Sequence, residues 1–320
     1  MPKSMNIAVA GGSHGIGRYI VEQLLCLKSS RCPYLHIIVL SRSGGENIVS
    51  HGSSAQRVQV DYDDADALTA LFRNHNIDTI ICTLITSDFA QFSALQERML
   101  RAALEVPSFR RFAPSEFGVD SEAPKTYPYK TSKLPILRTL RSIQSTHPGF
   151  EWTKFVPGVF INYFGIGNPK PDEEKAFQYL NRMPPRIDIA SGTADIPGDG
   201  NAKQFYTLAE DMARFVAEAT QLDVWPEQLD AAGDEIGFND IIRIAERITG
   251  KKFKVQYHTK EDILAVANIP PKERIDYFYL AQLSVIVGET GQGKALNELF
   301  PYIKPTTVEE FLEKWWGKEN

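Results

Sequence analysis

The first half of the chain alternates short apolar runs with segments whose apolar residues recur at helical spacing. Residues 15–27, for example, place Ile16, Ile20 and Leu24 on one helical face directly after the apolar run 5–10. Strands are predicted at 5–10, 35–40, 57–60, 79–84, 109–114 and 152–156, and helices at 15–27, 65–74, 89–103 and 132–145. Because parallel strands need crossover connections of helix length, this alternation predicts a doubly wound, Rossmann-type α/β fold with a parallel sheet. Its ligand crevice is expected at the carboxyl ends of the strands.

Beyond residue 158 the alternation becomes less regular. Residues 165–185 are rich in glycine, proline and charge, which predicts a loop or lid over a pocket. A strand at 205–207 and a helix at 210–220 are expected to return to the first domain, and helices at 238–249, 261–267 and 307–316 to form a smaller lobe. The predicted organisation is a Rossmann domain of residues 1–157 plus about 190–232, and a discontinuous substrate lobe of about 158–189 and 233–320.

Composition narrows the function classes. The net charge of -5, with basic residues scattered, argues against nucleic acid as a partner. No apolar run approaches the roughly 20 residues that span a bilayer, so we expect no membrane association and a cytoplasmic protein. Three cysteines without metal-ligand spacing predict reduced, mostly buried thiols and no metal site. The sequence leaves a homodimer open as the assembly state.

The strongest chemical signal is a glycine-rich turn between the first strand and the first helix. Glycines in such a turn allow a tight bend and close approach of a pyrophosphate, and the helix N-terminus adds free amides and a favourable dipole. A glycine pattern alone is weak, but a strand–turn–helix setting makes it a specific indication of dinucleotide binding. The cofactor-binding residues predicted here are Gly11, Gly12, Ser13, His14, Gly15, Ile16 and Gly17.

The end of the second strand favours NADP(H) over NAD(H). An acidic residue there would bond the ribose 2′-hydroxyl of NAD, but this chain has Ser41, Arg42 and Ser43, with no acid before Glu46. A planar guanidinium flanked by two hydroxyls suits a 2′-phosphate. The alternative is that Arg42 is an ordinary solvated surface residue.

Further cofactor contacts are predicted from topology. Asp61 follows the third strand and is suited to the adenine, although carboxylates in this position are often helix caps. Thr83 and Leu84 end the fourth strand and are expected beside the nicotinamide ribose. Backbone near Pro157, with Phe160, is expected close to the nicotinamide.

Three residues are candidates for catalysis. Tyr129 and Lys133 form a Tyr-x-x-x-Lys pair on one face at the start of a predicted helix. A lysine ammonium one turn away lowers the pKa of a tyrosine that donates a proton to a carbonyl, and it can also hold the nicotinamide ribose. Ser115, at the end of the fifth strand, could orient the substrate oxygen. Such a pair also occurs by chance on exposed helices.

Aromatic residues near the sixth strand predict a substrate pocket. Asn162, Tyr163 and Phe164 follow that strand, and Phe117 follows the fifth. Together with Phe160 they would line an aromatic pocket suited to a planar substrate. Aromatic core packing between the lobes is the alternative.

These motifs resemble a known superfamily. The glycine turn, Ser115 and the Tyr129-x-x-x-Lys133 pair resemble the short-chain dehydrogenases/reductases. The stretch Phe-Ala-Pro-Ser-Glu-Phe-Gly-Val-Asp at 112–120 is similar to the signature of the NmrA-like and isoflavone reductase-like branch. Further matching segments lie at 197–200, 207–211, 249–252, 300–301 and 307–312, so the resemblance covers nearly the whole chain.

The resemblance implies a catalytic lysine. In the plant reductases of that branch it stands in a Lys-x-x-Ile context, which Lys133 matches through Ile136. Regulatory NmrA proteins bind dinucleotide without turnover, so the presence of Lys133 favours an enzyme. The glycine spacing is nearer that of other short-chain reductases than of this branch, and a tyrosine in the place of Tyr129 is not a fixture of it.

The expected function is an NADPH-dependent reductase of the short-chain type. It would transfer a hydride to a carbonyl, enone or benzylic carbon of a small metabolite of aromatic, polyketide-like or alkaloid-like character. Two alternatives stay open. One is an NmrA-type NADP(H)-sensing regulator without turnover, and the other is a non-redox cyclase or dehydratase that retains the cofactor site.

Overall fold

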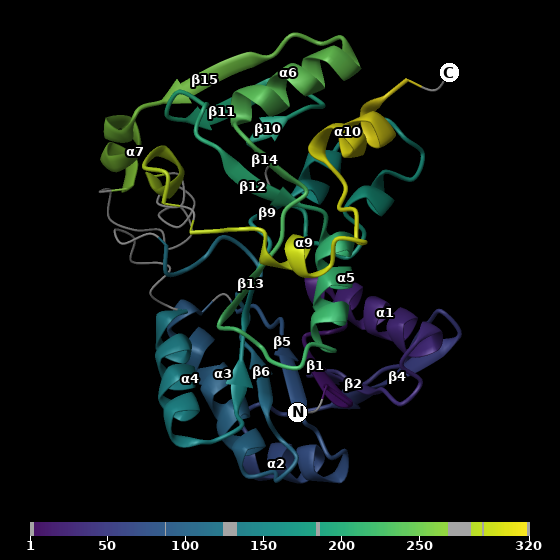
Figure 1. Cartoon of the computed structure of the whole chain (residues 1–320). Coiled ribbons are helices and arrows are strands. Elements are labelled where there is room, and N and C mark those ends of the chain that lie inside the picture. Colours follow the sequence, from purple (N-terminus) through teal and green to yellow (C-terminus); the bar gives the residue numbers. More distant parts are fainter. Residues whose placement is uncertain are drawn as a thin grey trace.

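The computed structural model describes residues 3–86, 88–123, 133–183, 186–267, 283–289 and 291–318. Its largest element is a seven-stranded sheet of order β3-β4-β2-β1-β5-β6-β7 (Figure 1). All pairs in it are parallel except the β3–β4 edge pair. The doubly wound, Rossmann-type fold predicted from the sequence is therefore confirmed. The strands are β1 (Asn6–Ala10), β2 (His36–Ser41), β3 (Ile48–Ser50), β4 (Ser53–Gln59), β5 (Thr79–Cys82), β6 (Arg111–Ala113) and β7 (Glu151–Trp152).

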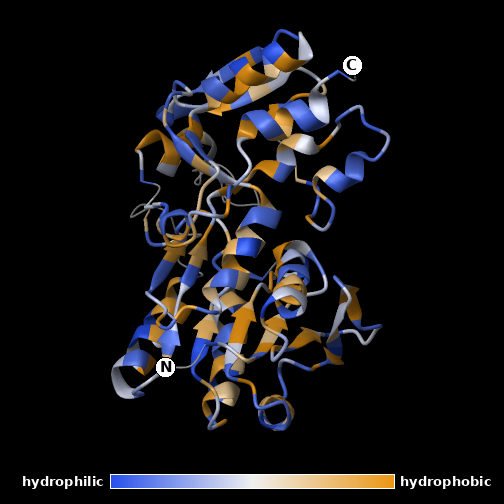
Figure 2. Ribbon diagram, turned by 45° about the vertical axis from the view of Figure 1, so that its right-hand side comes forward, coloured by the Kyte–Doolittle hydropathy of each residue, from blue (hydrophilic) through white to orange (hydrophobic). Residues whose placement is uncertain are grey.

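Helices cover both faces of this sheet. One face carries α1 (Gly15–Ser30) and α5 (Ala209–Ala219), which pack against each other. The other carries α2 (Ala65–Asn74), α3 (Phe89–Leu104) and α4 (Leu134–Thr146). Both layers bury apolar side chains against the strands, and Figure 2 shows the hydrophobic strands enclosed by helices with polar outer faces. Burial of this apolar area is the main stabilising contribution.

The edges of the sheet differ from the sequence prediction. The strand expected at 152–156 divides at Thr153, because the amide of Lys154 bonds to Glu227 and leaves the sheet. The second part, β8 (Lys154–Val156), pairs in parallel with β13 (Gln228–Asp230). The hairpin β3–β4 was not predicted: its turn, His51–Gly52, uses two left-handed residues, which matches the twist of paired strands.

The C-terminal part contains two further small sheets. One has the order β10-β11-β15 and the other β14-β12-β9. Their apolar faces form a third core with α6 and α10, which pack against each other (Figure 1). The bounds are β9 (Val159–Phe160), β10 (Ile187–Asp188), β11 (Thr193–Pro197), β12 (Gln204–Thr207), β14 (Asp234–Ile236), α6 (Phe238–Thr249), β15 (Lys254–His258), α7 (Lys260–Ala267), α9 (Ala295–Leu299), α10 (Val308–Trp316) and the 3-10 helices η2 (Ile161–Gly165) and η3 (Glu173–Ala176).

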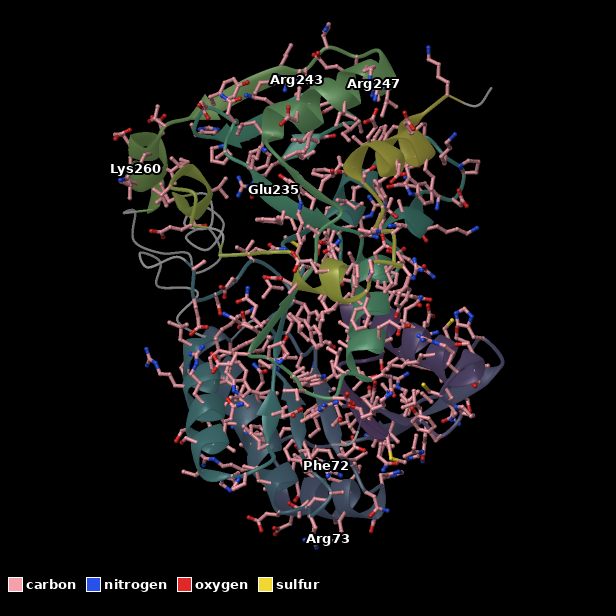
Figure 3. The ribbon with its side chains drawn as sticks, in the orientation of Figure 1. Phe72, Arg73, Glu235, Arg243, Arg247 and Lys260 are labelled. Carbon is pink, nitrogen blue, oxygen red and sulfur yellow. The ribbon has the colours of Figure 1, made fainter. Side chains whose placement is uncertain are left out.

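The surface helices are amphipathic, with apolar side chains facing the core and charged side chains facing solvent. On α2, Phe72 is fully buried while its neighbour Arg73 is exposed and projects from the ribbon (Figure 3). On α6, Arg243 and Arg247 project outward, and Arg247 pairs with Glu309 of α10. No helix in the described ranges is long and apolar enough to cross a bilayer. The residue bounds of the two predicted lobes stay a prediction.

Candidate functional site

The glycine turn between β1 and α1 has the geometry of a tight phosphate loop. Gly11 and Gly15 have φ values of 82° and 58°, which favour glycine. A Cβ on Gly17 would lie 2.3 Å from Oγ1 of Thr83 and 2.6 Å from the carbonyl oxygen of Gly11. Thr83 donates to the carbonyl of Ala10 at 2.8 Å. Thr83 therefore packs the turn from behind, and any side chain at position 17 would push the turn away from α1.

The front of the turn fits an anionic group. Oγ of Ser13 is buried and has no hydrogen-bond partner, a cost that a bound acceptor would remove. A Cβ on Gly15 would meet no atom within 4 Å, so the space before that residue is open. The first amides of α1 have no intrahelical acceptor and carry the positive end of the helix dipole. His14 is exposed at the N-cap, and Gly12, Ile16 and Gly17 are buried.

The predicted lid region touches this turn. The amide of Gly15 donates to the carbonyl of Tyr179 at 2.9 Å, and the Tyr179 hydroxyl donates to Oε1 of Glu22 on α1 at 2.7 Å. The guanidinium of Arg18 lies 5.3 Å from the centre of the Tyr179 ring. The segment around Tyr179 is thus held on the first turns of α1. Sequence reasoning gave no role to Tyr179, because the contact joins residues about 160 positions apart.

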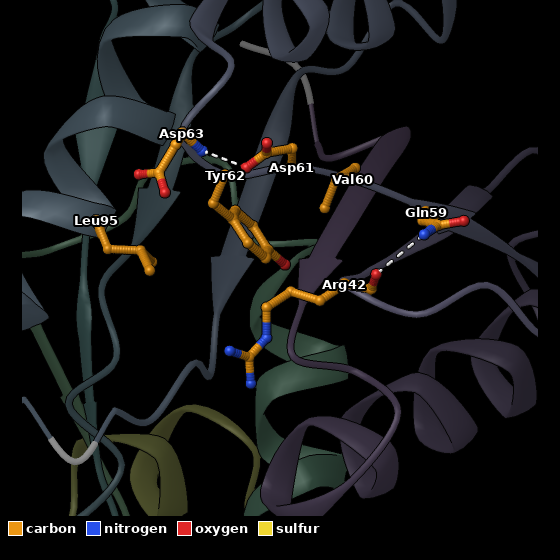
Figure 4. A pocket seen from close by; sticks show the side chains of 7 residues that line it. All are labelled: Arg42, Gln59, Val60, Asp61, Tyr62, Asp63 and Leu95. Atoms are coloured by element: carbon orange, nitrogen blue, oxygen red, sulfur yellow. Dashed lines mark hydrogen bonds between the residues drawn. The ribbon is translucent and has the colours of Figure 1, made fainter.

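A cavity of about 450 Å³ lies beside the ends of β2 and β4 (Figure 4). Arg42 extends into it below the ring of Tyr62, whose hydroxyl bonds to the carbonyl of Leu40 at 3.2 Å. Asp61 accepts from the amide of Asp63 at 2.9 Å in a local turn. The cap of α2 is Asp64, not Asp61. The cavity is lined by Arg42, Gln59, Val60, Asp61, Tyr62, Asp63 and Leu95.

The ends of β5 and β6 are tied together through Ser115. Its hydroxyl donates to the carbonyl of Leu84 at 2.9 Å, and its amide donates to Oε1 of Gln96 at 2.8 Å. Ser115 is 7% exposed. Because its proton is directed at Leu84, the hydroxyl of Ser115 can act on another oxygen as donor only after rotating.

Lys133 stands at the N-cap of α4 and reaches back over the segment that follows β6. Its ammonium donates to the carbonyl of Glu116 at 3.3 Å and lies 4.0 Å from Oε1 of the same residue. The ring centre of Phe92 is 5.7 Å away. The Lys133 side chain is 25% exposed, so part of it remains open to solvent. Tyr129, the other member of the predicted pair, lies outside the described residues.

Glu116 is a buried acid that sequence reasoning did not select. It is 1% exposed, and Ser121 donates to its Oε2 at 2.7 Å. Its Oε1 has no hydrogen-bond partner. Burial raises the pKa of Glu116, although the nearby Lys133 ammonium opposes the shift.

A network of ion pairs fixes the loop that carries these residues. Nζ of Lys154 lies 2.7 Å from both Asp120 and Glu122, and Arg141 of α4 forms a two-pronged pair with Glu122. Arg141 also pairs with Glu227. The network joins the loop, α4 and the start of β8, and so it holds the base of the site rigid.

The predicted substrate-binding residues are more buried than expected. Asn162 is fully buried and bonds to Ala176, Ala209 and Glu210, so all its polar atoms are engaged within the protein. Phe164 packs in the C-terminal core. For these two residues the structure favours the structural alternative over ligand contact.

The remaining predicted contacts surround the same region. Phe160 packs in the core beside α1 and α5, and the carbonyl of Pro157 accepts from Thr207 at 2.6 Å. Phe117 and Tyr163 are only partly buried, and Phe117 stacks on Phe155. They are the predicted aromatic residues that keep exposed surface.

Two groupings emerge from these placements. At the ends of β5 and β6, Ser115 donates to Leu84, and Lys133 donates to Glu116, the residue that follows Ser115 in the chain. The glycine turn and the Arg42 cavity form a second grouping along β1, β2 and β4. No group of histidine, cysteine or acidic side chains in the described part of the chain could hold a metal ion.

Comparison with known proteins places this arrangement in a family. A sequence model described as the NmrA-like family matches residues 3–312. The protein named oxidoreductase swnN of Metarhizium robertsii is 26% identical, with 97% of each chain covered. The isoflavone reductase homolog A622 of Nicotiana tabacum is 24% identical, again with 97% of each chain covered.

Solved structures show the same fold. The crystal structure of an isoflavone reductase superimposes with a TM-score of 0.74 at 19% identity, covering 97% of this chain and 99% of that one. A complex of leucoanthocyanidin reductase with NADPH from Vitis vinifera gives 0.71 at 19% identity, covering 96% and 98%. The resemblance inferred from the sequence motifs is confirmed. This chain belongs to the NmrA-like family.

Proposed function

We propose that the protein is an NADP(H)-dependent oxidoreductase of the isoflavone reductase-like type that reduces a small metabolite. The relatives named above are an oxidoreductase and an isoflavone reductase homolog. The observation that carries the proposal is the ammonium of the partly exposed Lys133 side chain beside a buried, unsatisfied carboxyl oxygen of Glu116. A protein that only binds dinucleotide has no need of such a poised cation at the strand ends.

The residues that would hold the cofactor are those whose polar groups lack partners. Ser13 and the first amides of α1 after Gly15, whose own amide bonds to Tyr179, would bind the pyrophosphate, and the cavity at Arg42 would take the adenosine end. Thr83 would fix the turn against α1. Two neighbouring structures are described as complexes with NADPH or NADP+, which favours the phosphorylated cofactor for this fold.

The chemistry follows from what surrounds Lys133. When bound, the reduced nicotinamide supplies a hydride to an electrophilic carbon of the substrate. Lys133 would hold and deliver the proton that balances the charge on the substrate oxygen, as a general acid. Glu116 would position the ammonium, which donates to its backbone carbonyl. Ser115 would orient the substrate oxygen after rotating away from Leu84, and Tyr129 stays a proposed proton donor.

For the substrate we propose an aromatic, polyketide-like or alkaloid-like metabolite with a carbonyl, enone or benzylic carbon. Relatives and neighbours include a eugenol synthase of Petunia hybrida and a complex with (+)pinoresinol, both names of aromatic compounds. In this chain the partly exposed Phe117 and Tyr163 would contact such a ring. A cytoplasmic location and a homodimeric assembly stay predictions, which cell fractionation and light scattering would check.

The direct test of the site is Lys133→Ala. Turnover of a reducible substrate should fall at least a hundredfold, on the scale of losing a general acid, while NADPH affinity changes only a few-fold. Lys252→Ala, at a lysine that is 87% exposed on the far lobe, is the matched control. Near-normal turnover in Lys133→Ala would remove Lys133 from the mechanism. Tight NADPH binding without turnover by the unmodified protein would favour the regulatory alternative.

A further inference from the structure

A second arginine lies at the end of β2. In the parallel pair β2–β4, Val39 is opposite Arg57 and Ser41 is opposite Gln59. The Arg57 side chain reaches the segment after β2, where its Nη2 donates to Oγ of Ser41 at 3.2 Å and to Oγ of Ser43 at 3.0 Å. Arg57 therefore contacts both hydroxyls that flank Arg42 in the sequence.

The hydrogen-bonding capacity of Arg57 is not filled. Its Nε is buried without any partner, and the described residues include no carboxylate in an ion pair with Arg57. A Cβ on Gly45 would lie 2.5 Å from Nη1, so the glycine lets the guanidinium fit beneath the loop. A partly buried cation with an unused donor is costly unless an anion completes its surroundings.

Arg42 and Arg57 lie on different faces of the sheet. Along β4 the side chains alternate, so Arg57 is on the same face as Ala55, which packs in the core with α1. Arg42 instead lines the cavity with Val60 and Tyr62, which belong to the core on the opposite face. The phosphate loop is on the α1 side, together with Arg57.

We propose that Ser41, Ser43 and Arg57 bind the 2′-phosphate of NADP(H), and that Arg42 contacts the adenine instead. The proposal rests on the proposed NADP(H) function and makes Arg57 the specificity-determining residue of that site. The sequence motif predicts that Arg42 binds the 2′-phosphate, because Arg42 directly follows the second strand. The motif cannot identify Arg57, because Arg57 lies on the neighbouring strand β4.

The hydrogen bonds explain how the three groups would act together. Arg57 donates to the oxygen lone pairs of both serines, so each hydroxyl keeps its own proton for an anion. The positive charge of the guanidinium beside both hydroxyls favours an anion at the same place. Charge-assisted bonds of this kind are the strong ones. The 2′-hydroxyl of NAD(H) offers no charge to Arg57, so the same arrangement would discriminate against it.

Calorimetric titration of the full-length protein with 2′,5′-ADP and with 5′-ADP isolates the role of the 2′-phosphate without any substrate. Arg57→Met should weaken 2′,5′-ADP on the order of tenfold to hundredfold, as expected for charge-assisted hydrogen bonds, and leave 5′-ADP within about twofold. Arg42→Met should weaken both nucleotides by similar factors, because both contain adenine. Arg73→Met, at an exposed arginine of α2, is the control.

Ser43→Ala provides a second variant that leaves the guanidinium in place, at an exposed position. It should weaken 2′,5′-ADP several-fold and leave 5′-ADP unchanged. Equal weakening of both nucleotides by Arg57→Met would make Arg57 a purely structural residue, and no effect on either would also overturn the proposal. Failure of the unmodified protein to bind 2′,5′-ADP and NADPH would instead contradict the proposed cofactor itself.

Discussion

The ammonium nitrogen of Lys133 lies 4.0 Å from Oε1 of Glu116, a buried carboxyl oxygen without a hydrogen-bond partner. Glu116 lies shortly after β6, and Lys133 lies directly before α4. Ser121 fixes the other carboxyl oxygen at 2.7 Å, so the free one has a defined position. The carboxyl group therefore offers the Lys133 ammonium a fixed partner at the ends of the strands.

Replacing the Glu116 carboxylate should lower turnover more than cofactor affinity. In Glu116→Gln the Lys133 ammonium loses the carboxyl group that lies 4.0 Å away, so its position at the strand ends is less well defined. We expect kcat to fall on the order of tenfold, the scale of a contact to a charged group, while the Kd of NADPH stays within about twofold. Steady-state kinetics and a binding titration of both proteins measure this. An unchanged kcat would show that Glu116 does not position Lys133.

The same substitution should not reduce stability at neutral pH. Burial raises the folded-state pKa of Glu116 above its unfolded value. The native protein therefore loses stability as the pH rises from the unfolded pKa of about 4.3 through the folded one. A glutamine carries no such cost, so Glu116→Gln should be at least as stable at pH 7, with the difference shrinking below about pH 4. Urea unfolding at both pH values measures this, and a large loss at pH 7 would contradict it.

Gly17→Ala should separate cofactor binding from general folding. The new methyl would lie 2.3 Å from Thr83 and 2.6 Å from a backbone oxygen of Gly11, so the turn must shift. NADPH affinity should fall on the order of tenfold or more, because the amides of α1 leave their positions. Thr83→Val keeps the same shape and loses only the bond to Ala10, worth about 1 kcal/mol. Affinity falling equally in both variants would mean that turn packing does not control binding.

Tyr179→Phe tests the contact between the lid region and α1. It removes the hydroxyl that bonds to Glu22 while retaining the ring beside Arg18. Hydrogen exchange should accelerate in residues 173–180, consistent with the loss of about 1 kcal/mol. Tyr302→Phe, which removes a hydroxyl bond to Glu218 on an exposed surface, is the control. Unchanged exchange at 173–180 would show that the segment is held by other contacts.

Acid sensitivity should arise partly at Glu122. The bonds from Arg141, and then from Lys154, lower the pKa of Glu122 to about 2. A depressed folded-state pKa contributes stability above the unfolded value of about 4.3, and that contribution is lost as the pH falls toward 2. Glu122→Gln should therefore be less stable at pH 7 by on the order of 2 kcal/mol. Denaturant titrations at pH 7, 4 and 3 measure this. The unfolding free energies of the two proteins should become more alike as the pH falls, and a difference that stays constant with pH would contradict the prediction.

The fold could be predicted because its signal is local. Apolar runs at β1, β2 and β5 and the helical spacing of α1 each identify an element without knowledge of its neighbours. The edge hairpin β3–β4 was not predicted, because β3 buries only Ile48 and so has no apolar pattern in the sequence. The division of the 152–156 strand at Thr153 was not predicted. It depends on which strand each half pairs with, and that is set by distant residues, including Glu227.

The site was predictable only where a motif lies in one segment. The glycine turn and Lys133 belong to such motifs. Arg57 acts through a neighbouring strand, and Tyr179 acts on a helix about 160 positions away. The place of Glu116 depends on its burial and on its contact with Lys133. Asn162 was predicted to bind substrate because it follows a strand. Its side chain is buried and bonds to other protein groups. Sequence position alone does not show whether such a side chain contacts a ligand or other protein groups.

The most direct test of the central claim follows NADPH absorbance and product mass together, with purified protein and a panel of aromatic ketones, enones and cyclic ethers. The proposed function predicts substrate-dependent loss of NADPH, matched by a product two hydrogens heavier, and neither change in Lys133→Ala. Product formed without any loss of NADPH would contradict hydride transfer and identify a non-redox enzyme. Tight NADPH binding with no reaction across the panel would contradict the reductase and favour a sensor.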